Sequence, residues 1–285
     1  MTPLTRSLLL AFGAGTAVLL TGALAAAVSA SPWTASWAVA VALAIAVVVA
    51  HRWKTEYFAA QREGLAQVTR RLELLQDQIS ETQGLVQLVR FDDRYPMPFG
   101  GGWALTADAG AVLVREVALR RPRVVVELGS GVSTLLVGRM LKEAGAGKLY
   151  SLDHDAAWAE RTRAHVRANG LEDFVVVLDA PLTRQRHDGE EYDWYNLPDP
   201  VQQLRDIDLL VVDGPPQSLN PHGIPRYPAL PVFGPKLSAD ALIYVDDAKR
   251  PHEQRMIEAW MKLDPSLGKW MVQTAPGTCL LSRAR

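Results

Sequence analysis

Glycines and acidic residues follow the apolar, strand-like runs in the C-terminal two thirds of the chain. Gly129 and Gly131 follow the run 123–128, and Asp153 follows the run 148–152, about 20 residues later. Glycine lets the backbone approach a ligand closely, and an acid at the second position can accept the two hydroxyls of a ribose. The pair predicts a site for an adenosine-type cofactor.

A second group of acids follows two later runs. Asp213 directly follows the run 207–212, and Asp246 and Asp247 directly follow the run 241–245. Three carboxylates at one edge of a sheet are costly without a cation, and hard oxygen ligands suit Mg²⁺, Mn²⁺ or Ca²⁺. In the equally weighted alternative, Asp208 and Asp247 face solvent or cap the next helix, and Asp213 acts alone near the substrate. A general base is then needed, for which His154, His222 and Asp213 are candidates.

The elements that must position these residues alternate between strands and helices, which predicts a doubly wound α/β fold with a mostly parallel sheet. Ligands of such sheets bind beyond the carboxyl ends of the strands. The last two runs, joined through Ala275-Pro276-Gly277, predict a terminal antiparallel hairpin. The predicted strands are 123–128, 148–152, 174–178, 207–212, 241–245, 269–273 and 278–281, and the predicted helices are 108–120, 133–143, 156–168 and 252–262.

The N-terminal region differs from the rest, because no Asp, Glu, Lys or Arg occurs between Ser7 and Ala50. Two apolar stretches, 8–30 and 33–50, are each long enough for a membrane span and predict a two-helix transmembrane hairpin over 1–51. Basic residues flank both ends, so we expect the catalytic domain to face the cytoplasm at the inner membrane. A cleaved signal peptide is the less favoured alternative.

A long polar helix is predicted over 52–90. Its apolar residues alternate in steps of three and four, broken only at Thr82, which is typical of a coiled-coil seam. We expect this stalk to form a homodimer through 65–89; the alternative is an amphipathic helix packed on its own domain, which Gly64 and Gly84 favour. The seam consists of Leu65, Val68, Leu72, Leu75, Ile79, Val86 and Val89.

The remaining residues, 91–285, form the predicted catalytic domain. The whole chain has 285 residues and a formal net charge of −1, so no overall field attracts nucleic acid, and we expect no nucleic-acid partner. The polar-aromatic stretch 184–197 and the loop 215–228 are predicted to flank the acceptor pocket, because their aromatic side chains offer stacking faces. Local packing of those aromatic residues is the alternative.

Three motifs together resemble the class I S-adenosylmethionine-dependent methyltransferases. They are Val-Glu-Leu-Gly-Ser-Gly-Val-Ser-Thr at 126–134, Ser-Leu-Asp-His-Asp at 151–155 and Asp-Leu-Leu-Val-Val-Asp-Gly at 208–214. A dinucleotide site would require a third glycine where Thr134 stands, which disfavours a nicotinamide-dependent oxidoreductase. The resemblance covers essentially the whole domain and implies a seven-stranded Rossmann-like sheet with S-adenosyl-L-methionine as cofactor.

The resemblance also implies the roles of individual residues. The first motif lines the methionine end of the cofactor, Asp153 holds the ribose beside His154, and Asp179 and Ala180 lie near the adenine. The cofactor residues implied are Glu127, Gly129, Ser130, Gly131, Ser133, Asp153, His154, Asp179, Ala180 and Asp213.

The acids Asp213, Asp246 and Asp247 resemble the divalent-metal site of the catechol O-methyltransferase branch, although the lysine expected after Asp213 is missing. Asp213 and His154 are the catalytic candidates. We therefore expect a membrane-anchored O-methyltransferase whose acceptor is a small, glycan or lipid-linked molecule. A divalent cation that assists the reaction is an optional part of this expectation. A dimeric membrane scaffold without activity is the non-enzymatic alternative.

Overall fold

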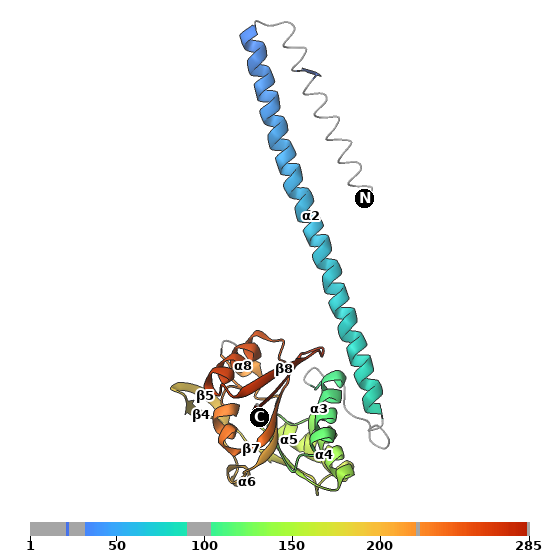
Figure 1. Ribbon diagram of the computed structural model, residues 1–285, viewed down its shortest axis with the longest axis vertical. Helices are drawn as coiled ribbons and strands as arrows, with labels where there is room; N and C mark the ends of the chain where they lie inside the picture. Colours follow the sequence, from blue (N-terminus) through green and yellow to red (C-terminus); the bar gives the residue numbers. More distant parts are fainter. Residues whose placement is uncertain (1–20, 23–31, 90–103, 221–222, 284–285) are drawn as a thin grey trace. The chain divides into compact units, whose positions relative to one another are not determined.

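A seven-stranded sheet forms the centre of the C-terminal part of the chain (Figure 1). The computed structural model describes residues 21–22, 32–89, 104–220 and 223–283. The strand order is β3-β2-β1-β6-β7-β9-β8. The strands are β1 (Val124–Leu128), β2 (Lys148–Asp153), β3 (Val175–Asp179), β6 (Ile207–Val212), β7 (Leu237–Val245), β8 (Leu267–Val272) and β9 (Thr278–Arg283).

The sheet is parallel from β3 to β7, and only β9 and β8 introduce antiparallel pairs. This confirms the predicted mostly parallel sheet with a terminal hairpin. The central strands β1 and β6 are buried over nearly their whole length, which agrees with their uninterrupted apolar sequences.

Helices cover both faces of the sheet and create two apolar cores. One core contains side chains of α3 (Ala107–Arg120), α4 (Val132–Ala144) and α5 (Ala156–Ala168). The other contains α7 (Ala229–Phe233) and α8 (Pro251–Leu263), close to the short helix α6 (Asp199–Gln202). The fold is thus the doubly wound, Rossmann-like arrangement that the sequence predicts.

A small hairpin, β4 (Leu182–His187) paired with β5 (Glu190–Tyr195), is an element that the sequence analysis treats as a loop. Its charged residues alternate on the exposed face, and Arg184 pairs with Glu191 and Asp193 across the two strands. The apolar residues of β5 point into the second core. The two-residue alternation is the signal that could have identified it.

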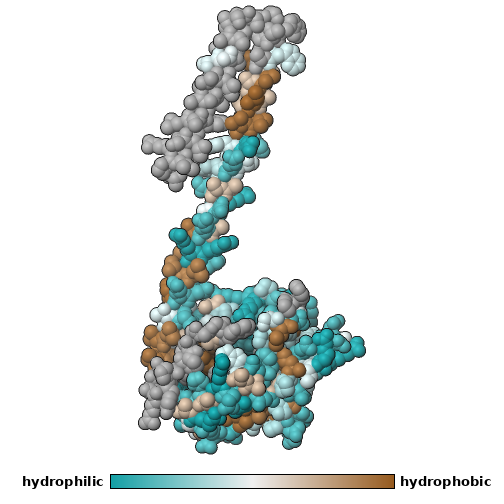
Figure 2. All heavy atoms as spheres, turned by 180° about the vertical axis from the view of Figure 1, so that it is seen from behind, coloured by the Kyte–Doolittle hydropathy of each residue, from teal (hydrophilic) through white to brown (hydrophobic). Residues whose placement is uncertain are grey.

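The helix α2 (Pro32–Leu88) joins two regions that the sequence analysis separates at residue 51. The second predicted span, 33–50, and the stalk are one continuous helix, while the first predicted span lies outside the described residues apart from Thr21 and Gly22. Apolar side chains are exposed on the N-terminal part of α2 (Figure 2). Among the helices that the structure describes, none combines the length and apolarity needed to cross a membrane.

The last turns of α2 pack against the catalytic domain through one face. Glu81 accepts hydrogen bonds from the backbone N–H groups of Ala107 and Asp108 at the start of α3. Ser80 donates to the Asp108 carboxylate at 2.7 Å, and Leu88 is buried in the first core. The alternative of a helix packed on its own domain is therefore correct for this face.

Gly84 makes the close approach between α2 and α3 possible. A Cβ atom at this position would lie 2.3 Å from the backbone nitrogen of Asp108, whereas one at Gly64 would meet nothing within 4 Å. Glycine at 84 is thus required by packing, although it weakens the helix.

We predict that Gly84→Ala lowers the free energy of unfolding by about 1–3 kcal/mol, because the added methyl group clashes with rigid backbone. Gly64→Ala is the matched control and should stabilise the helix by up to about 1 kcal/mol. Thermal unfolding followed by circular dichroism measures both. Equal stabilisation by the two substitutions would show that α2 does not pack on α3 in solution.

Candidate functional site

Backbone hydrogen bonds tie together the ends of the central strands. The N–H of Gly129 donates to the carbonyl of Leu152, and the N–H of Asp213 donates to the carbonyl of Leu128. Gly129 has a φ of +96°, a conformation that side-chain-bearing residues rarely adopt. The turn after β1 is consequently held directly against the ends of β2 and β6.

Glu127 lies beneath this turn and does not reach the surface. Its side chain is fully buried and accepts hydrogen bonds from Thr134 Oγ1 at 2.5 Å and Ser151 Oγ at 2.6 Å. Thr134 in turn accepts from the backbone N–H of Gly131. Glu127 therefore holds the start of α4 and does not line the cavity described below, and its contact with the cofactor stays a prediction.

Burial raises the pKa of Glu127 to about 7, against an opposing effect of the hydroxyl hydrogen bonds. One carboxylate oxygen, Oε1, has no hydrogen-bond partner. Ionising this group inside the core is consequently unfavourable near neutral pH.

Asp153 is fixed at the end of β2 by three hydrogen bonds. Its carboxylate accepts from the Ser130 N–H at 3.0 Å, from Ser130 Oγ at 2.5 Å and from the Asp155 N–H at 3.0 Å. His154 Nδ1 lies 3.5 Å from the same carboxylate. A carboxylate has about four lone-pair positions, so Asp153 retains capacity for a further donor.

A cavity of about 250 Å³ lies beside these strand ends. It brings together Gly129, Ser130, Asp153, His154, Asp213, Asp246 and Asp247 of the predicted site, with Ala104, Asp155, Trp158, Tyr195, Gly214, Pro216, Ser218, Leu219, Arg226 and Arg250. Residues from the ends of β1, β2, β6 and β7 thus share one space, as the parallel sheet predicts.

Other predicted site residues do not line this cavity. Ser133 is buried with Glu127, and Ala180 is buried with its N–H donating to the carbonyl of Asp153. Asp179 is exposed and forms an ion pair with Arg163 at 3.1 Å. Gly131 is the N-cap residue directly before α4, and the candidate base His222 lies outside the described residues.

The aromatic residues of β5 pack mainly inside the protein. Trp194 is fully buried, and Tyr192 stacks on Tyr227 with ring centroids 5.6 Å apart. Of these residues only Tyr195 lines the cavity. The alternative of local packing is correct for Tyr192 and Trp194, because both side chains complete the second core.

The three predicted acids do converge, with oxygens of Asp213, Asp246 and Asp247 within 4.8 Å of one another. Burial raises the pKa of Asp213 to about 7, opposed mainly by Arg226, and burial also raises the pKa of Asp246 well above its usual range. Asp246 Oδ1 is buried without a hydrogen-bond partner. At least one of these carboxyls is therefore readily protonated near neutral pH.

Arg226 is a member of this cluster that the sequence analysis misses. Its side chain is only 4% exposed, and its Nη2 lies 3.2 Å from Asp247 Oδ2 and 3.5 Å from Asp213 Oδ1. A single arginine in a loop rich in proline and glycine carries no motif. The available signal is electrostatic, because three carboxylates require a countercharge and a buried arginine supplies one as well as a metal does.

Residues 126–248 match the family model of a methyltransferase domain. Over this stretch the chain is similar to a methyltransferase domain, which agrees with the resemblance of its motifs to the class I S-adenosylmethionine-dependent methyltransferases. The matched residues include the strand ends and acids that line the cavity. This match favours a methyltransferase over the nicotinamide-dependent alternative.

Solved structures similar to this chain include a methyltransferase from Geobacter sulfurreducens, which is 18% identical in sequence. The matched region covers 71% of this chain and 88% of the Geobacter protein, with a TM-score of 0.47. The SAH-bound methyltransferase PaMTH1 from Podospora anserina is 16% identical, with coverages of 71% and 88% and a TM-score of 0.49. An O-methyltransferase from Bacillus cereus in complex with SAH is 15% identical, with coverages of 72% and 90% and a TM-score of 0.46.

We predict that Glu127→Gln stabilises the methyltransferase domain increasingly as the pH rises. The folded pKa of about 7 lies above the ordinary 4.5, so ionisation progressively destabilises the wild-type fold between these values. The difference in Tm between variant and wild type should grow by roughly 5 °C from pH 5 to pH 8.

Exposed Glu172→Gln is the control for the loss of one surface charge in the same unfolding experiment. A pH-independent difference in Tm for Glu127→Gln would contradict the raised pKa.

Proposed function

We propose that this chain transfers a methyl group from S-adenosylmethionine to an oxygen of a small, glycan or lipid-linked acceptor. The observation that carries the proposal is one cavity lined by three acids. They are Asp153, which stands where an acid can bind the hydroxyls of a ribose, and Asp213 and Asp246. The bound cofactor would supply a methyl group on a positively charged sulfur. The residues of the chain then have to bind it, orient the acceptor and take up a proton.

The turn after β1 and the end of β2 are suited to the cofactor. Gly129 presents backbone without a side chain, and Asp153 is held rigidly by Ser130 while keeping capacity for a ribose hydroxyl. His154 is partly exposed beside Asp153. We assign His154 to the cofactor end of the cavity, where it orients Asp153.

Asp213 is suited to act as the general base. It lines the cavity, and its pKa of about 7 lets it exchange a proton near neutral pH. In the proposed reaction this carboxylate would take the proton of the acceptor hydroxyl, whose oxygen would receive the methyl group. The bound cofactor would supply that methyl group and keep the electron pair of the broken carbon–sulfur bond, so charge and atoms balance.

A divalent cation fits this set of residues poorly. Arg226 and Arg250 both contact Asp247 Oδ2, at 3.2 Å and 2.7 Å. A metal bound by Asp247 would lie beside two permanent positive charges. The cation-assisted version of the reaction therefore forms no part of the proposed mechanism.

We predict that Asp153→Ala weakens binding of S-adenosylmethionine by about 10-fold or more, because a charge-assisted hydrogen bond to the ribose is lost. Isothermal titration calorimetry on the full-length chain measures this, with NAD as the competing cofactor. Asp173→Ala, an exposed acid near the opposite end of β3, is the control.

Wild-type binding of NAD rather than S-adenosylmethionine would refute the proposed reaction class. Unchanged affinity in a folded Asp153→Ala variant would refute only the ribose assignment.

We further propose that residues 8–50 attach the chain to the inner membrane, with the catalytic domain on the cytoplasmic side. The support is the absence of charged residues between Ser7 and Ala50 and the exposed apolar side chains near the start of α2, such as Val47 and Val48. An acceptor presented at the membrane surface would suit this location.

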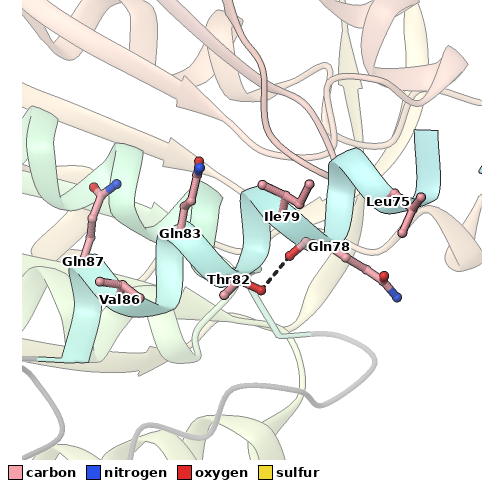
Figure 3. A pocket seen from close by; sticks show the side chains of 7 residues that line it. All are labelled: Leu75, Gln78, Ile79, Thr82, Gln83, Val86 and Gln87. Carbon is pink, nitrogen blue, oxygen red and sulfur yellow. Dashed lines mark hydrogen bonds between the residues drawn. The ribbon is translucent and has the colours of Figure 1, made fainter. Parts of the chain in front are cut away.

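We also propose that α2 pairs with a second copy of the chain through the seam at 65–89. Leu65, Leu72 and Ile79 are 69%, 61% and 59% exposed, although large apolar residues are usually covered. Figure 3 shows Leu75, Ile79 and Val86 along a hollow bordered by glutamines, and Thr82 donates to the carbonyl of Gln78. The face with Glu81 and Gly84 is used for α3, so the seam is free of that contact.

We predict that Leu72→Cys forms a disulfide-linked dimer when membranes containing the full-length chain are mildly oxidised. Arg70→Cys, exposed on the opposite side of the heptad, should crosslink at least about 5-fold less. The natural Cys279 is buried and provides no background. Gel electrophoresis without reductant measures the dimer.

Equal crosslinking at both positions would contradict the seam. Recovery of the chain outside the membrane fraction would contradict the attachment.

A further inference from the structure

Arg226 contacts three carboxylates. Besides Asp213 and Asp247, its guanidinium is 3.7 Å from Glu253 Oε1, and it donates to the backbone carbonyls of Pro215 and Asp246. Glu253 is itself 2% exposed. The side chain therefore donates to acceptors that follow β6 and β7 and lies beside a carboxylate of α8.

The residue after Arg226 is anchored in the second core. The carbonyl of Tyr227 accepts a hydrogen bond from Trp260 Nε1 at 2.8 Å, and the hydroxyl of Tyr227 donates to Asp188. Trp260 is fully buried. This packing fixes the backbone at 226–227, so the guanidinium is placed by the fold and does not depend on a bound ligand.

Arg226 contacts side-chain oxygens of two of the three acids that a shared metal ion would bind. The oxygens of the three acids are near one another, yet those of Asp213 and Asp247 face this guanidinium. Mg²⁺ and Ca²⁺ bind carboxylate oxygens at about 2.0–2.6 Å, which would require Arg226 to withdraw. Arginine stays protonated at all physiological pH values, so it cannot yield its charge to a metal.

We infer that Arg226 is the built-in cation of this site, a positioning residue that holds Asp213 and Asp247 at the cavity in place of a divalent metal. The guanidinium does not contact the carboxylate of Asp246, whose Oδ1 stays buried without a hydrogen-bond partner. The inference rests on the proposed function for the identity of the cavity, but the choice between arginine and metal is a property of the cluster itself.

The test is a titration of the full-length protein with Mg²⁺ and with Mn²⁺, followed by calorimetry and thermal unfolding. The wild-type protein should show no binding heat at millimolar metal and no change in Tm. Arg226→Ala leaves the carboxylates without their countercharge and should gain Mn²⁺ binding, seen as a rise in Tm of several degrees. Arg226→Lys keeps the charge and should remain insensitive, as should the exposed control Arg205→Ala.

Stoichiometric metal binding by the wild-type protein, reversed by a chelator, would overturn the inference. A folded Arg226→Ala variant that gains no metal affinity would also overturn it, because the arginine would then be only structural. If Arg226→Ala does not fold, the wild-type and Arg226→Lys titrations still decide between arginine and metal.

Binding of S-adenosylmethionine, measured on the same wild-type sample, tests the proposed function independently. Metal insensitivity without cofactor binding would refute the methyltransferase reaction and leave the role of Arg226 intact.

Discussion

The site depends on a set of backbone hydrogen bonds that continue the sheet one residue beyond the ends of its parallel strands. Gly129, Asp213 and Asp246 each donate an N–H to the last residue or last but one of a neighbouring strand. These bonds place the turn after β1 and the acids after β6 and β7 at one edge. Because the strands are parallel and in register, residues 84 positions apart in the sequence, Gly129 and Asp213, become neighbours.

Electrostatics then determines which chemistry this edge can support. Taking several carboxylates out of water is costly, and the chain offsets the cost in different ways at different positions. Hydrogen bonds stabilise the carboxylate of Asp153, and burial raises the pKa of Glu127. Asp213 and Asp247 both lie beside the positive charge of Arg226. One cavity is therefore lined both by a rigidly hydrogen-bonded carboxylate, Asp153, and by a carboxyl group with a raised pKa, Asp213.

The helix α2 has two faces that differ in composition and in exposure. Small and acidic residues, such as Gly84 and Glu81, dock on the start of α3, whereas the apolar seam is exposed. The two faces also place different constraints on the sequence. The face packed on α3 requires glycine at position 84, because a larger side chain would clash, whereas the seam is defined only by its repeating apolar pattern.

The sequence by itself determined the mostly parallel sheet, its terminal hairpin and the acids and glycines at the strand ends, because buried parallel strands are uninterrupted apolar runs and their carboxyl ends must meet. It did not determine the order of the strands in the sheet. It did not determine which of those residues reach the cavity. Glu127 turned inward and Asp179 outward because the hydroxyls of Thr134 and Ser151 and the guanidinium of Arg163 lie where they do. Only the tertiary structure placed Arg226 among the acids. A countercharge needs only to be close in space, so no fixed spacing in the sequence predicts which arginine supplies it.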